Sequence, residues 1–233
     1  MQTLQADGPA EVRGRLIRQR DFVAASSARE LSSILRPAVN IVHWKRSLPK
    51  DLLDYAAAEA RHGVLPVELE CDLDFAPTAS LVAPLCSAPE RAALLSDLQR
   101  LIAHFRSLSR TRTAKLFFGT VNDDKCRKFH SDYVGLRMVC TYAGPGTQLV
   151  PNAGVVRAKM NTGGDIDARN AEIVPDLRAL TQSRSGDVVL LKGELWPGNH
   201  GRGAVHRSPP LAGKEQPRLV LILTAHRVRE RTL

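Results

Sequence analysis

Residues 136–150 read LRMVCTYAGPGTQLV, an apolar segment followed by a Gly-Pro-Gly turn and a second apolar segment. Short apolar runs that alternate with turn residues are typical of antiparallel strands. The same pattern continues on both sides of this stretch, from residue 116 to residue 225. We therefore predict a β-barrel or a two-sheet jelly roll here. Its expected strands cover residues 116–121, 136–142, 148–150, 155–160, 188–191, 204–206 and 218–225.

The half that precedes residue 116 carries mainly helical patterns. The clearest covers residues 87–108, where apolar residues recur at helical spacing and Ser87 with Glu90 forms a capping-box pattern. A shorter helix is expected at residues 26–35, and another begins near Ser47 and ends at Gly63. Short strands are expected at residues 39–44 and 67–73.

These patterns together predict an α+β fold in one domain that spans residues 1–233. A mainly helical N-terminal part, about residues 20–115, is expected to pack on a β-barrel core at about residues 116–227. The length of 233 residues and the hydrophobic share of 43% are enough for a sizeable core.

Composition also limits the location and the partners. The longest apolar runs, such as residues 219–223, are far too short to cross a bilayer, and residues 1–5 do not begin a secretory signal. The four cysteines form no Cys-x-x-Cys pair and are expected to be reduced thiols. We therefore expect a cytoplasmic protein without a membrane partner.

The net charge of +9 comes largely from arginine clusters at residues 13–20, 106–115 and 227–231. Such a surface is either a solvated face or a device that attracts anions. The basic runs have no interleaved aromatic residues and match no recognition motif, so nucleic acid is not an expected partner. A small-molecule substrate, with the basic surface pointing to an anion, is the partner we expect; the sequence does not indicate an oligomeric state.

A metal site is predicted from three residues. His130 and Asp132 form a His-x-Asp pair, and residues two apart on a strand point to the same face. A second imidazole, His206, ends another predicted strand 76 residues later. Two histidines and one carboxylate leave open positions on a metal ion, which is the arrangement of non-haem iron(II) oxygenases. His130, Asp132 and His206 are thus the candidate metal ligands and catalytic residues.

Arg218 follows His206 by 12 residues and opens the last long strand. A guanidinium near the metal is suited to hold the far carboxylate of a dicarboxylate co-substrate while the other end of that molecule reaches the metal.

The order of His-x-Asp, Thr141-Tyr142, Gly186-Asp187, His206 and Arg218 resembles that of 2-oxoglutarate/Fe(II)-dependent oxygenases with the double-stranded β-helix fold. More narrowly, CRKFHSD at 126–132, TYAGPGT at 141–147, LKGE at 191–194 and VHRSPP at 205–210 look like the bacterial family of unknown function called DUF1826. The narrow resemblance runs from about residue 20 to the end, and the oxygenase resemblance covers a handful of positions.

The oxygenase resemblance implies a jelly-roll or cupin-like barrel and an Fe(II)/2-oxoglutarate-dependent dioxygenase, with Fe(II), 2-oxoglutarate as co-substrate and O2. Hydroxylation of a small substrate is the expected outcome. Arg218 matches the residue that binds 2-oxoglutarate, and Tyr142 is expected to add a hydroxyl to that cofactor site. Many members carry serine two residues after the arginine, whereas this chain has Val220, so Tyr142 or Thr224 has to supply the hydroxyl.

Alternative interpretations stay open. A cupin-like metalloenzyme would keep the triad without using 2-oxoglutarate, and a non-catalytic protein of metal binding or zinc homeostasis would bind zinc with a closed shell. Cys126 and Cys140 could complete such a zinc site. The loop from Trp196 to His200 is either a lid over the site or an ordinary connection.

Overall fold

In the computed structural model of this protein, residues 21–123, 126–210 and 216–227 are described. The arginine cluster at residues 13–20, and Arg229 and Arg231 of the tail, lie outside the described residues. Within the described ranges, no helix combines the length and the apolar character that crossing a bilayer requires.

Ten strands in the described part of the chain form two sheets. The large sheet has seven strands in the order β1-β2-β8-β5-β10-β4-β3, and the small sheet has three in the order β7-β6-β9. Neighbouring strands are antiparallel except β1 and β2, which are parallel. The strands are β1 Phe22–Ala25, β2 Ile41–Trp44, β3 Val67–Asp72, β4 Thr113–Val121, β5 Leu136–Ala143, β6 Gln148–Val150, β7 Thr181–Gln182, β8 Val188–Lys192, β9 Val205–Arg207 and β10 Arg218–Ala225.

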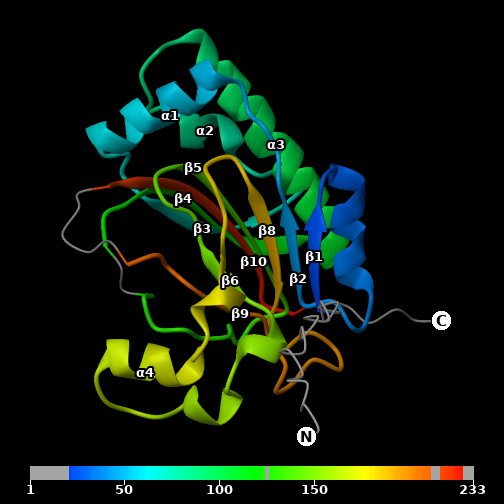
Figure 1. The fold of residues 1–233 in the computed structure, drawn as a ribbon. Helices are drawn as coiled ribbons and strands as arrows, with labels where there is room; N and C mark the ends of the chain where they lie inside the picture. Colours follow the sequence, from blue (N-terminus) through cyan, green and yellow to red (C-terminus); the bar gives the residue numbers. More distant parts are fainter. Residues whose placement is uncertain (1–20, 124–125, 211–215, 228–233) are drawn as a thin grey trace, which may run out of the picture.

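Helices cover one face of the large sheet, and the small sheet lies on the other side, next to α4 (Figure 1). The α-helices are α1 Lys50–His62, α2 Thr78–Val82, α3 Pro89–Ser109 and α4 Ile166–Ile173. Four 3-10 helices complete the described elements: η1 Ala28–Leu35, η2 Asn152–Gly154, η3 Arg157–Lys159 and η4 Leu177–Ala179.

Strand β10 is buried on both faces. Leu219, Leu221 and Leu223 are fully buried in the core that the large sheet shares with α1 and α3. Because side chains alternate along a strand, Arg218 and Thr224 point to the opposite face. On that face a second core, which includes Ile41, Leu149, Val189, Leu191 and Ala204, joins the large sheet to the small one. The sheet therefore has a helix-covered outer face and an inner face.

The helices largely match the sequence prediction, but their N-terminal caps do not. Helix α1 ends at Gly63 as predicted, where φ is 84° and a left-handed residue closes the helix, but its N-cap is Pro49. The capping box predicted for Ser87 and Glu90 is wrong, because the N-cap of α3 is Ala88 and no side chain caps it. Pro89 occupies the first helical position, where its missing N–H leaves one fewer donor to satisfy.

The strand predicted at residues 155–160 is wrong. This stretch follows η2 and contains η3. Val155 N donates to Asn152 O within this turn, and the Arg157 guanidinium bonds Gly203 O. The apolar side chains Val155 and Met160 pack on a small core beside the small sheet, so their burial does not depend on a strand. A short apolar run alone does not distinguish these two arrangements.

The N-terminal part was predicted to be mainly helical with short strands at residues 39–44 and 67–73, and the structure has β2 and β3 at these two places. This part contributes β1, β2 and β3 to the large sheet, at the two edges of the strand order. The structure thus shows a mixed α/β arrangement with one large sheet, and the strict division into a helical part and a barrel is not confirmed.

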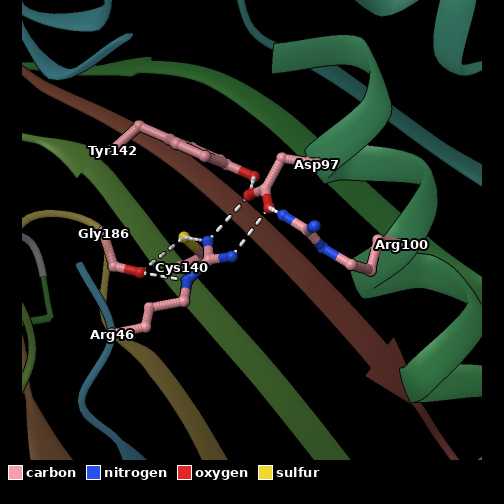
Figure 2. A network of polar contacts seen from close by, with 6 residues as sticks. All are labelled: Arg46, Asp97, Arg100, Cys140, Tyr142 and Gly186. Carbon is pink, nitrogen blue, oxygen red and sulfur yellow. Dashed lines mark hydrogen bonds and ion pairs between the residues drawn. The ribbon is translucent and has the colours of Figure 1, made fainter. Parts of the chain in front are cut away.

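A buried polar network joins α3 to the outer face of the large sheet (Figure 2). The two terminal guanidinium nitrogens of Arg46, Nη1 and Nη2, donate to the carboxylate of Asp97, each at 2.7 Å. The Tyr142 hydroxyl donates to the same carboxylate at 2.7 Å, and Arg100 forms a further ion pair with it. Burial by itself would raise the pKa of Asp97, but the bonds and charge of Arg46 outweigh it and hold that pKa below its usual value.

Replacing Asp97 by Ala is predicted to destabilise the fold by about 3–5 kcal/mol, because the charge of Arg46 stays buried without its partner. Urea unfolding at pH 7 measures this. Since the folded-state pKa of Asp97 is lowered, its stabilisation is present above pH 3.8 and is lost as pH falls further. The Arg100→Ala control removes an arginine that is 56% exposed and should change stability by less than about 1 kcal/mol. An Asp97→Ala cost as small as that of the control would contradict the prediction.

Candidate metal centre

His130 and His206 are held side by side by their own backbones. The N–H of each donates to the carbonyl oxygen of the other at 3.0 Å, and this single β-bridge extends the small sheet beyond β9. Their ring centroids are 4.5 Å apart. Residues separated by 76 positions in the sequence therefore present two imidazoles at one point.

Asp132 joins the two imidazoles from the segment that follows His130. Its Oδ2 lies 3.3 Å from Nε2 of His206, and its Oδ1 lies 3.7 Å from Nε2 of His130. One donor atom from each residue lies within 4.8 Å of the others. The side chain of His206 is 6% exposed, that of Asp132 11% and that of His130 32%, so the centre is accessible mainly from the side of His130. The structure thus brings all three predicted residues together.

The orientation of both rings suits a metal ion. His130 Nδ1 lies 2.8 Å from the carbonyl oxygen of Lys128, and burial lowers the pKa of this ring to about 4. His206 Nδ1 lies 3.0 Å from the carbonyl oxygen of Ala204. Because a carbonyl only accepts, each Nδ1 carries the proton and each Nε2 is left with a lone pair. Two lone pairs and a carboxylate then converge, and a bound cation is what this donor set fits.

Arg137 of β5 is a residue of this site that the sequence analysis missed. Its Nη1 lies 2.8 Å from Oδ2 of Asp132, and its Nε donates to Oγ1 of Thr224 at 3.3 Å. Burial would raise the pKa of Asp132, but the neighbouring groups, first His206 and then Arg137, outweigh it and lower that pKa. Thr224 is therefore engaged by Arg137. The one sequence feature that pointed to Arg137 was its place as a basic residue in a mainly apolar strand that follows His-x-Asp.

Arg218 is buried on the inner face at the start of β10, with only 6% of its surface exposed. Its Nε and Nη1 are buried and have no hydrogen-bond partner among the described residues. Burial lowers the pKa of this guanidinium. A buried cation with unpaired donors is costly unless an anion completes it, so Arg218 is a candidate anion-binding residue.

The structure does not bring Tyr142 to the Arg218 side. Strand alternation places Tyr142 with Met138 and Cys140 on the outer face, in the core beneath the helices. Its hydroxyl is fully buried and donates to Asp97 (Figure 2). The two hydroxyls considered for the carboxylate, those of Tyr142 and Thr224, thus have other partners here.

The segment that follows β8 packs closely on the metal-ligand segment. A Cβ on Gly193 would lie 2.0 Å from the carbonyl oxygen of Val134, so only glycine fits there. Glu194 accepts hydrogen bonds from the Ser131 hydroxyl at 2.6 Å and from Gly203 N at 3.1 Å. Ser131 lies between His130 and Asp132, so this loop is tied to the residues that carry two of the candidate ligands.

The other candidates do not join the centre. Trp196 contacts Lys192, whose ammonium lies 4.8 Å from the ring centroid, and His200 is exposed. Cys140 lies on the outer face near Arg46, and Cys126 is exposed. Neither cysteine nor His200 is among the described residues whose donor atoms gather at this centre. The alternative zinc site that would include Cys126 and Cys140 is therefore not assembled among the described residues.

A cavity of about 350 Å³ lies beside the centre, on the inner face of β4, β5 and β10. Arg137 lines it while also pairing with Asp132, so one side chain connects the cavity to the candidate metal ligands. Phe117 and Ile222 give it an apolar wall, and Glu68 and Lys115 line its charged part.

Comparisons with known proteins give a family and a fold. The family described as "Protein of unknown function (DUF1826)" matches residues 25–224. Among curated proteins, none matches this chain. Among solved structures, dioxygenase for auxin oxidation 1 from Arabidopsis thaliana, in a binary complex with 2-oxoglutarate, is 10% identical with a TM-score of 0.51, covering 91% of this chain and 94% of that chain.

Two further structures are similar to a lesser degree. The dioxygenase for auxin oxidation in rice is 13% identical with a TM-score of 0.49, covering 88% of this chain and 82% of that chain. A prolyl-4-hydroxylase from Pseudomonas putida is 13% identical with a TM-score of 0.45, covering 87% of this chain and 100% of that chain. At such identities a likeness concerns the fold alone, and the Arabidopsis structure confirms the expected similarity to a double-stranded β-helix.

Replacing His206 by Ala is predicted to weaken Mn(II) binding by at least about 100-fold, since loss of an outer partner alone costs 10–100-fold. Titration of the metal-free protein, followed by electron paramagnetic resonance of free Mn(II), measures this. His200→Ala is the matched control, because it removes an exposed imidazole in the preceding loop and should bind Mn(II) as the wild type does. Equal binding by the two variants would remove His206 from the ligand set.

Proposed function

The chain belongs to the DUF1826 family, and for this member we propose the activity of a non-haem Fe(II)/2-oxoglutarate-dependent dioxygenase. The convergence of two imidazole nitrogens and one carboxylate carries the proposal. Such a triad occupies one side of a six-coordinate ion and leaves the opposite positions open for ligands.

Arg218 supports 2-oxoglutarate as the co-substrate. Its buried Nε–H and Nη1–H groups lack partners among the described residues, and a carboxylate can accept from both. The Arabidopsis structure with a similar fold is a complex with 2-oxoglutarate. A cupin-like metalloenzyme without this co-substrate would leave these two buried N–H groups without a partner.

Each residue of the site has a separate role in the proposed activity. His130, Asp132 and His206 hold the ion, and the carbonyl partners of the two Nδ1 atoms keep both Nε2 lone pairs directed at it. Arg137 fixes the carboxylate of Asp132 in place. When bound, Fe(II) with 2-oxoglutarate and O2 supplies the oxidising chemistry that inserts oxygen into a C–H bond.

The substrate is proposed to bind in the cavity next to Arg137. Phe117 and Ile222 would contact its apolar part, and Lys115 would attract an anionic group. We propose hydroxylation of such a small molecule as the reaction. The four cysteines are all free, as suits the cytoplasm in which we place this activity.

Replacing Arg218 by Met is predicted to weaken 2-oxoglutarate binding by about 30-fold or more, because losing one partner of a buried, hydrogen-bonded charge pair costs about 2–5 kcal/mol. Calorimetric titration of 2-oxoglutarate into Mn(II)-loaded protein without oxygen measures the affinity. Succinate release by the Fe(II)-loaded protein in air measures turnover.

The control is Arg29→Met, which removes the same charge from an exposed position and should leave affinity unchanged. Mn(II) binding should persist in Arg218→Met, because Arg218 is not among the proposed ligands. Undiminished 2-oxoglutarate affinity in Arg218→Met, with the metal bound, would remove Arg218 from the co-substrate site. Absence of 2-oxoglutarate binding by the metal-loaded wild type would favour a metalloenzyme that uses another co-substrate.

A further inference from the structure

A second group of metal-binding side chains lies on the helical side of the large sheet. Glu59 and His62 are in the last turns of α1, and Cys86 is in the segment that leads to α3. One donor atom from each lies within 4.8 Å of the others. Since α1 and α3 cover the face opposite the small sheet, this group is separate from the triad (Figure 1).

The local structure holds the three side chains together. Glu59 and His62 are three residues apart on a helix, so both point to the same side. The Tyr55 hydroxyl, one turn earlier, donates to the carbonyl oxygen of Cys86 at 2.8 Å and fixes that segment against α1. Cys86 N lies 3.3 Å from Oε1 of Glu59, and Cys86 Sγ lies 4.0 Å from Nδ1 of His62.

Glu59 is the unusual member. Only 4% of its surface is exposed, whereas His62 and Cys86 are exposed. A buried carboxylate is costly unless it is paired or coordinates a metal. In the described structure its carboxylate accepts a long hydrogen bond of 3.3 Å from Cys86 N, and the Cys86 side chain is its other hydrogen-bond partner. The group is therefore a buried carboxyl group next to two exposed soft or borderline donors.

We propose that Glu59, His62 and Cys86 form a second metal site, which binds one divalent cation of the zinc class. Thiolate, imidazole and carboxylate are the three ligand types that zinc takes in proteins, whereas magnesium and calcium prefer oxygen alone. Cys86 binds as the thiolate, and its thiol proton passes to solvent. Three protein ligands leave the fourth position for water.

The distances suit a tetrahedral ion. Zinc bonds of about 2.3 Å to sulfur and about 2.0 Å to nitrogen place these two donors about 3.5 Å apart. The observed 4.0 Å between Cys86 Sγ and His62 Nδ1 needs a closure of about half an ångström, which rotation of two exposed side chains provides. A bound ion would tie the end of α1 to the segment that begins α3.

Cobalt(II) tests the site, because a cobalt–thiolate bond gives an intense near-ultraviolet absorption that the sulfur-free triad does not produce. The full-length, metal-free protein is titrated with Co(II). Because the triad also binds a divalent cation, we expect this band to saturate by two equivalents of added Co(II) and to disappear when Zn(II) is added. Cys86→Ser should abolish the band, and His62→Ala should weaken Co(II) binding at this site at least 10-fold.

Two controls separate this site from others. Cys126→Ser, which removes another exposed thiol, should keep the band, and Asp132→Ala should keep it even though the triad is disrupted. Thermal unfolding verifies that Cys86→Ser is folded. Absence of the band in the wild type, its persistence in Cys86→Ser, or its loss in Cys126→Ser would each overturn the proposal. Loss of the band in Asp132→Ala would also overturn it, since the two sites would then not be independent.

Discussion

The pair of backbone hydrogen bonds between His130 and His206 is the constraint from which the candidate metal centre follows. It fixes two distant segments in register, so the spacing of the imidazoles is set by the β-ladder and not by flexible side chains. Asp132 then needs only the two-residue step from His130 to reach the same point. A one-residue slip in this pairing would turn one ring to the other face and disperse the donors.

Two arginines give the inner face of the large sheet its electrostatic character. Arg137 is paired with Asp132, so its charge is compensated within the chain. Arg218, six residues before Thr224 on β10, has two buried N–H donors without a hydrogen-bond partner among the described residues. Both sit on strands whose other face is packed with apolar side chains beneath the helices. The rigid sheet therefore presents to the same interior one arginine paired with a carboxylate and one with two N–H donors left for a ligand, as suits a site that receives an anion.

Much of this arrangement was readable in the sequence, and the failures have physical reasons. Apolar runs and turn residues located most strands, and the spacing of His130, Asp132 and His206 predicted their meeting. The face taken by Tyr142 was not readable, because alternation tells which residues share a face but not which face meets the helices. Arg137 was missed because its contact with Asp132 depends on the path of residues 133–135, which connect Asp132 to β5. Residues 155–160 show that burial of an apolar run fixes neither strand nor turn.

Gly193 has no side chain, yet it limits which substitutions the metal centre tolerates. Its Cα hydrogen faces the carbonyl oxygens of Val134 and Asp132, and any side chain would push these two segments apart. The position of Asp132 is thus coupled to a residue 61 places later in the chain that supplies no donor atom to the centre. Substitutions that make room for a larger substrate are then easier at Phe117 and Ile222, whose side chains border the cavity. They are harder at the contact between Gly193 and the segment from Asp132 to Val134, where no space is left.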